Sequence, residues 1–264
     1  MPCPGRGVGG RVPLQAMWVA DEIDALLSDG VLRSHFLMPI HFEANLATKL
    51  MVLVRFGEWD AILDVPFKAD AELYKTHTLF LHWARGIALG VRGELSAARE
   101  EQTKFTVLLS GLAPKDRMKH NTNVAEHMGP IGAAILEGEL SYREGKYNEC
   151  WEALESSVAL YDAMPYDEPA GYMMSPRQTF GALLVEQQLH ARAVPLYEAD
   201  LQAFPKNVFS LAGLHACLKA GNGSDASRLA EIAYLGAALK EARSLADVPI
   251  GASCACARDF NVTG

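Results

Sequence analysis

The sequence predicts an all-helical protein in which the helices come in repeated pairs. Apolar residues recur at three- and four-residue steps over long stretches, which is the pattern of amphipathic helices. Runs of alternating polar and β-branched residues, typical of strands, are absent. Short turn motifs, most of them with glycine, recur at residues 57, 93, 145 and 188. Repeats of this size with two helices each are typical of a helical solenoid, in which each pair packs on the next.

Residues 1–13 (MPCPGRGVGGRVP) are expected to form a flexible leader rich in glycine and proline. Gly5, Gly7 and Gly10 have the G-x-G-x-x-G spacing of a dinucleotide-binding loop. That loop requires a buried strand before it, and Met-Pro-Cys-Pro cannot form a central strand. The motif therefore does not indicate nucleotide binding.

The periodicity then predicts a helical array over residues 14–245 and a C-terminal tail over 246–264. Two long loops, 110–129 and 164–174, lengthen the repeat. Pro66 falls inside an expected second helix, which should be kinked or begin late because proline lacks an N–H group. The expected helices cover residues 15–27, 42–56, 77–91, 95–109, 130–143, 147–163, 175–187, 191–203, 208–220 and 224–240.

The turn motifs share a pattern in which an aromatic or apolar residue follows two positions after the turn residue. The pattern resembles the tetratricopeptide repeat, a 34-residue helix-turn-helix unit. The copy that begins at Met174 fits best, with small residues at Gly181 and Ala193, Tyr197 at the aromatic position and Pro205 near the end. The four turns are Gly57-Glu-Trp59, Gly93-Glu-Leu95, Gly145-Lys-Tyr147 and Gln188-Leu-His190.

The resemblance covers roughly residues 40–245 and implies a solenoid of about four to five degenerate repeats. The chain resembles the C-terminal part of larger tetratricopeptide-repeat proteins of unassigned function. The chain is therefore expected to be a shortened relative or an incomplete gene product. In that family the concave face holds an extended peptide or a partner helix, which implies a non-catalytic scaffold for protein binding.

Projecting the repeat register predicts which side chains line the concave groove. Tyr142 and Arg143 are the preferred contact pair, since aromatic and arginine residues dominate interface energetics. The helix over 77–91 also carries an apolar set (Phe80, Trp83, Ile87 and Val91). These side chains either line a pocket or pack against the preceding helix pair, and packing is favoured. The predicted groove residues are Glu139, Tyr142, Arg143, Gln178, Glu186 and Lys219.

No catalytic residue, cofactor or metal is expected from the motifs. Cys254-Ala-Cys256 has no cysteine-rich mate in the sequence, so reduced thiols are expected there. His41-Phe-Glu43 matches half of a zinc-deaminase signature whose other half is absent. Two alternatives stay open: an enzyme or small-ligand site that uses the loop bearing His120 and His127, and a self-assembling repeat protein that forms homo-oligomers through an exposed terminal repeat.

Composition and charge narrow the class of partner. Half of the 264 residues are hydrophobic, which is enough to bury a sizeable core. The net charge of −8 argues against nucleic acid as the main partner. No signal peptide and no uninterrupted apolar run of about 18 residues is present, so a cytoplasmic protein without a membrane span is expected.

Overall fold

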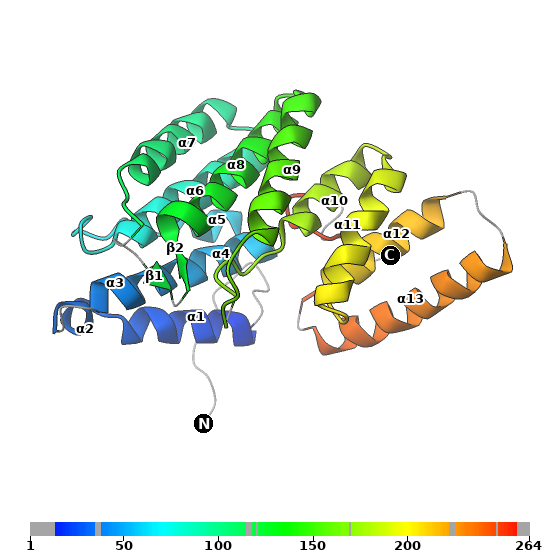
Figure 1. Cartoon of the computed structure of the whole chain (residues 1–264), viewed down its shortest axis with the longest axis horizontal. Coiled ribbons are helices and arrows are strands. Elements are labelled where there is room, and N and C mark those ends of the chain that lie inside the picture. The colour runs from blue at the N-terminus through cyan, green and yellow to red at the C-terminus, as the bar shows by residue number, and fades with distance from the viewer. Residues whose placement is uncertain are drawn as a thin grey trace.

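The described part of the chain is predominantly helical, as predicted (Figure 1). The computed structural model describes residues 14–34, 38–114, 118–119, 121–168, 170–221, 225–246 and 248–257. The expected leader, residues 1–13, lies outside these ranges. None of the described helices is long and apolar enough to cross a membrane.

The N-terminal part consists of short helices that pack beneath the longer ones. Glu43 is fully buried here, and its Oε1 accepts the backbone N–H groups of Thr76 at 2.7 Å and of His77 at 3.0 Å. The carboxylate thus caps the first turn of the next long helix. The elements are α1 (Leu14–Leu26), α2 (Asp29–Ser34), α3 (Met38–Phe42), the 3₁₀-helix η1 (Glu43–Leu46), α4 (Ala47–Phe56) and α5 (Trp59–Asp64).

The remaining helices follow as antiparallel neighbours along the chain. α6 packs on α7, α8 on α9 and α10 on α11, and α6 also packs on α4 and α8. Figure 1 shows the pairs following one another across the molecule, with α13 as the last helix. The elements are α6 (Lys75–Val91), α7 (Leu95–Ser110), α8 (Gly129–Arg143), α9 (Tyr147–Asp162), α10 (Pro176–Glu186), α11 (His190–Ala203), α12 (Val208–Ala220) and α13 (Ala226–Leu245).

The four predicted turns share one backbone conformation. Gly57, Gly93 and Gly145 have φ of 72°, 82° and 75°, in the left-handed region that favours glycine. Gln188, at the turn that lacks glycine, has φ of 59° and is the single non-glycine residue with positive φ in the described chain. In each case the second helix begins two residues later.

Small residues let the helices of a pair approach closely, as the repeat pattern predicts. A Cβ atom at Gly138 on α8 would lie 2.6 Å from Leu154 Cγ on α9. The glycine at 181 on α10 faces the ring of Tyr197 on α11, which is fully buried. A side chain at either position would overpack the interface between the two helices.

The largest buried cluster lies between α4, α6, α7 and α8. Phe80, Trp83 and Phe105 are fully buried within it, and Ile87 is 2% exposed. Trp83 meets Phe80 and Tyr172 edge-on, with ring centroids 5.8 Å and 6.3 Å apart. These side chains therefore belong to the helical core, and Trp83 and Ile87 also line a small cavity.

Two expectations about local structure are wrong. The helix expected to be kinked or late at Pro66 instead ends early: α5 stops at Asp64 and Val65 is extended, because the residue before a proline is disfavoured in the helical region. The predicted loop 110–129 contains a short antiparallel pair, β1 (Met118–Lys119) with β2 (Thr122–Asn123), and a π-helical turn η2 (Val124–Met128).

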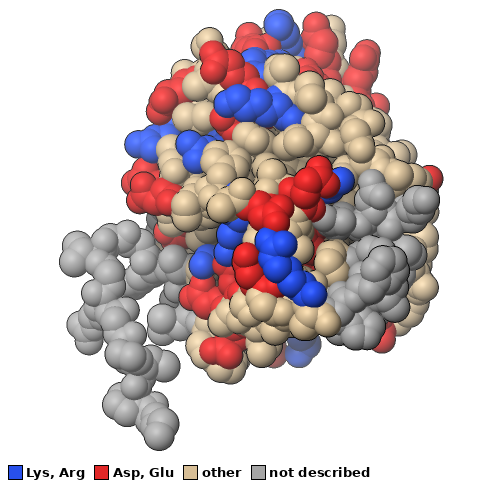
Figure 2. Space-filling view, turned by 90° about the vertical axis from the view of Figure 1, so that its left-hand side faces the viewer, with Lys and Arg blue, Asp and Glu red and all other residues tan. Residues whose placement is uncertain are grey.

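The surface carries both signs of charge. Figure 2 shows acidic and basic side chains interspersed with neutral ones on the face it presents. Several are paired, including Lys49 with Asp21 at 2.8 Å and Arg92 with Asp60 at 3.0 Å. This mixture explains how a net charge of −8 gives no single strongly charged patch on that face.

Candidate functional site

Residues 248–257, here called the C-terminal segment, follow α13 and lie against several of the earlier helices. The segment is not helical, yet Val248, Ile250, Ala255 and Cys256 are each less than 10% exposed. It contacts side chains from α4, α8, α10, α11 and α12. This non-helical stretch of bends and turns therefore borders Glu139, Arg143 and Gln178, which the repeat register predicts to line a groove.

Apolar contacts anchor the segment at Val248, Ile250 and Ala255. All three pack with Phe209 at the start of α12. Phe56 at the end of α4 and Trp59 of α5 pack against the same cluster. At the turn between these two helices, a Cβ atom at Gly57 would lie 3.0 Å from Ala255 Cβ, so the glycine also permits the close approach of the segment.

Hydrogen bonds fix the second half. Ser253 Oγ donates to the backbone oxygen of Gln178 at 3.0 Å, so the hydroxyl of Tyr197, 2.6 Å away, donates to Ser253. Arg143 donates from Nη2 to the backbone oxygen of Cys256 at 2.5 Å. Much of this recognition is directed at backbone atoms and a small hydroxyl side chain, so it requires few large side chains from the segment.

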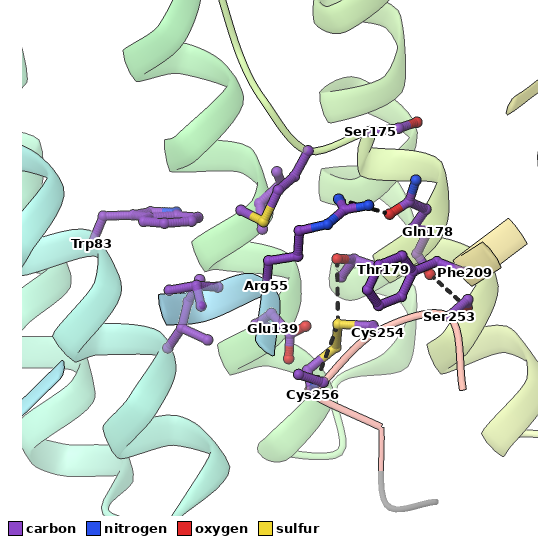
Figure 3. Close-up of a pocket in the computed structure, with 15 residues that line it drawn as sticks. Arg55, Trp83, Glu139, Ser175, Gln178, Thr179, Phe209, Ser253, Cys254 and Cys256 are labelled. Carbon is purple, nitrogen blue, oxygen red and sulfur yellow. Dashed lines mark hydrogen bonds between the residues drawn. A yellow bond between two sulfur atoms is a disulfide. The ribbon is translucent and has the colours of Figure 1, made fainter. Parts of the chain in front are cut away.

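A buried polar network supports the groove beside the segment (Figure 3). Arg55 donates to Gln178 Oε1 at 3.3 Å, and its guanidinium lies 4.2 Å from the centre of the Phe209 ring. Gln178 Nε2 donates in turn to Asp200 at 3.2 Å, and Asp200 accepts from Ser210 at 2.5 Å. Burial lowers the pKa of Arg55 to about 10.

Glu139 on α8 is the most unusual carboxylate of the site. It is 3% exposed, and its Oε2 accepts no hydrogen bond from any described residue. The nearest cation is Arg143, whose Nη2 is 3.6 Å from that oxygen. Burial raises the pKa of Glu139 to about 7, with the charge of Arg143 opposing the shift. Figure 3 shows the carboxylate beside Cys254 and Cys256.

The cysteine expectation is wrong for this pair, because Cys254 and Cys256 form a disulfide in the structure. The segment's own turn brings the two sulfurs together, and Thr179 donates to the sulfur of Cys254 at 3.6 Å. Cys150 and Cys217 are free and buried within helices, as expected.

Two cavities flank the C-terminal segment. One, of about 30 Å³, is enclosed by Arg55, Trp83, Glu139 and the two disulfide-bonded cysteines among others, and it has room for one or two water-sized groups. The other, of about 440 Å³, lies between the segment and helices α10 to α12. Its size falls within the usual range for ligand-binding clefts.

The structure brings together most of the predicted groove residues. Glu139, Arg143 and Gln178 border the C-terminal segment. Tyr142 and Glu186 lie next to them: the Tyr142 hydroxyl donates to Glu186 at 2.7 Å, and Glu186 lines the larger cavity. Lys219 is exposed in the last turn of α12 and lines neither cavity.

Sequence reasoning missed the C-terminal segment and residues Arg55, Thr179, Tyr197 and Phe209 as parts of this site. The spacing of Val248 and Ile250 would have indicated a half-buried extended stretch. Replacing Arg143 by glutamate is expected to lower stability, because the new carboxylate would face Glu139 in a buried position.

The loop of the alternative site is only partly described. His120 lies outside the described residues. His127 sits in η2, half-buried, and its Nδ1 accepts the backbone N–H of Asn123 at 3.0 Å. This bond gives His127 a local structural role at the start of α8.

Comparisons of the chain with protein-family models, with curated proteins and with solved structures found no match.

Proposed function

We propose that the helix pairs form a solenoid of the tetratricopeptide-repeat type and that the protein is a non-catalytic scaffold whose inner groove binds an extended peptide of a protein partner. The observation that carries this proposal is that residues 248–257, a non-helical stretch, already lie beside three of the predicted groove residues, Glu139, Arg143 and Gln178. Support for the repeat architecture comes from the shared turn conformation and from the glycines at the helix interfaces.

In this proposal the C-terminal segment is an intramolecular occupant that a partner peptide replaces. The contacts define the chemistry of that partner. Phe209 and Phe56 favour small and medium apolar side chains, and Arg143 and Gln178 engage the peptide backbone and a hydroxyl group. We expect a peptide with alternating apolar residues followed by small residues, as in Val248-Pro-Ile250 and Ser253-Cys-Ala255.

Competition between the two occupants provides the test. A fluorescent peptide with the sequence of residues 246–257 is titrated into the full chain and into Ala255→Glu, with anisotropy as the readout. Ala255 packs closely against Gly57, so a glutamate at position 255 should displace the segment and free the groove. We expect the variant to bind the peptide at least about tenfold more tightly than the native chain, since preoccupied sites lower apparent affinity in proportion to their occupancy.

Ala163→Glu is the matched control, because Ala163 is exposed at the end of α9, away from the segment. It should bind the peptide as weakly as the native chain does. Equal binding by all three proteins, or none by Ala255→Glu when its helical content is intact, would contradict the proposal.

A further inference from the structure

Cys254, Cys256 and Glu139 bring three potential metal-ligand atoms together, although the sequence separates the carboxylate from the cysteines by more than one hundred positions. The two Sγ atoms and a carboxylate oxygen all lie within 4.8 Å of one another. Cys256 and Glu139 are buried and Cys254 is half-buried. In the sequence, the lack of a second pair of cysteines argued against a metal site here. In the fold, a carboxylate of α8 lies beside the two cysteines and can act as a further ligand.

We propose that reduction of the Cys254–Cys256 disulfide creates a site for one thiophilic divalent cation, Zn²⁺, held by the two sulfurs and by the Glu139 carboxylate. The inference is independent of the proposed function, because it concerns a cation and these three side chains alone.

The buried carboxylate, with an oxygen that accepts no hydrogen bond and a nearest cation 3.6 Å away, is the observation that distinguishes this cluster from an ordinary disulfide. Oε2 of Glu139 is buried, accepts no hydrogen bond from a described residue and borders the cavity that the cysteines also line. A buried carboxylate without a hydrogen-bonding partner is costly, and a bound cation would satisfy it.

The geometry suits a tetrahedral ion. With Zn–S bonds of about 2.3 Å and Zn–O bonds of about 2.1 Å, the ligand atoms of such a site lie roughly 3.4–3.8 Å apart. The present span of 4.8 Å needs only small side-chain rotations once the sulfurs separate. The cavity of about 30 Å³ beside them leaves space for a water molecule as the fourth ligand.

The charges also balance. Two thiolates and one carboxylate carry three negative charges, and Zn²⁺ together with Arg143 carries three positive charges. Arg143 lies 3.6 Å from Glu139 and donates to the backbone oxygen of Cys256, so it neutralises the site while holding the cysteine turn in place. This is the role that second-sphere groups commonly have around zinc.

Reduction of the Cys254–Cys256 disulfide requires an external dithiol. A small dithiol attacks the half-buried sulfur of Cys254, the S–S bond breaks, and two electrons and two protons pass to the cysteines while the dithiol becomes a disulfide. Binding of Zn²⁺ then releases the two thiol protons to solvent. The oxidised chain, whose sulfurs are bonded to each other, offers no thiolate to the metal.

The test measures metal binding by the full-length protein in both redox states. Zn²⁺ is titrated against a chromophoric chelator, and Co²⁺ is used as a spectroscopic probe. We expect one ion per chain in the reduced form, a thiolate-to-cobalt charge-transfer band, and no competition with the chelator by the oxidised form. A reduced chain that competes no better than the oxidised one would overturn the proposal.

Variants identify the ligands. Cys254→Ser and Cys256→Ser should abolish the charge-transfer band, and Glu139→Gln should weaken Zn²⁺ binding at least about tenfold while circular dichroism shows an intact fold. Cys217→Ala and Glu152→Gln are the controls, a buried free cysteine and an exposed glutamate of α9, and both should bind as the native chain does. Native affinity in Glu139→Gln, or in either serine variant, would show that these three residues do not form the site.

Discussion

Gln188 is the turn residue at which the chain departs from the glycine of the other turns. Three of the four turns have glycine where φ is positive, and the fourth places glutamine in the same conformation. A side chain in the left-handed region costs roughly 1–2 kcal/mol. The native chain therefore carries backbone strain at one turn that the other three avoid.

Gln188→Gly should raise the free energy of unfolding by up to about 1 kcal/mol, because relief of the strain outweighs the extra freedom of glycine in the unfolded chain. Gly145→Ala is the matched change in the opposite direction. Since no atom lies within 4 Å of a Cβ at Gly145, its expected loss of about 1 kcal/mol comes from φ alone. Urea denaturation of both variants measures the two changes in the free energy of unfolding. A stabilised Gly145→Ala variant would refute this explanation of the turns.

The contribution of His77 to the stability of the fold depends on pH. Burial, with smaller contributions from the charges of Lys68 and Lys49, lowers the pKa of His77 to about 4 from the usual 6.5. The unfolded chain therefore binds a proton more readily than the folded one. The stability from the neutral imidazole is complete above about pH 6.5 and is lost as the pH falls towards 4.

At about 1.4 kcal/mol per pKa unit, this loss amounts to about 3 kcal/mol between pH 6.5 and 4. His77→Gln lacks the titrating group, so the stability of this variant should fall less steeply over the same interval than that of the native chain. Parallel slopes in chemical denaturation at several pH values would mean that His77 is not the group responsible.

At the scale of elements, the interface between paired helices depends on small residues facing large ones. Gly138→Ala should destabilise the protein by about 1–3 kcal/mol, because the new methyl group meets Leu154 across the α8–α9 interface. Gly30→Ala in α2 is the control: nothing lies within 4 Å of its Cβ, and alanine is the better helix former. Thermal melting compares the two, and Gly138→Ala should destabilise a Leu154→Ala background less than the native chain, because the clash with Leu154 is absent there. Equal melting temperatures for both glycine variants would contradict this packing.

The elements also show what the sequence could predict. Long amphipathic stretches placed all of the major helices from α6 onward to within a few residues, because periodicity and turn residues are local signals. The short helices α2 and α3, the β1–β2 pair and η2 were missed, since helices of one or two turns have too few residues to establish a period. Pro66 was misread because its effect falls on the residue before it.

The candidate site was only half predictable for a related reason. The repeat register places Glu139, Arg143 and Gln178 on the inner face, and this needs only helical geometry. That residues 248–257 return to this face depends on the path of the chain after α13, which no local pattern encodes. The closeness of Glu139 to Cys254 and Cys256 follows from that return and was therefore invisible in the sequence.

At the scale of the whole molecule, the C-terminal segment connects helices that are otherwise far apart along the chain. It touches α4 through Gly57 and Phe56, α8 through Arg143, and α12 through Phe209. In the solenoid that we propose, distant repeats have few contacts, so the segment would add cooperativity that successive pairs alone do not provide. Under the proposed function, displacement of the segment by a partner peptide would loosen the packing between the helix pairs.

The central claim is that the C-terminal segment lies in the groove of its own chain. The most direct measurement is photo-cross-linking from position 252, where a photoreactive amino acid replaces Ala252 and can enter the adjoining cavity of about 440 Å³. We predict cross-links within the monomer to α10 and α12, at residues such as Ala182, Ala212 and Ala216. Cross-links only between chains, or none to α10 and α12, would contradict the account.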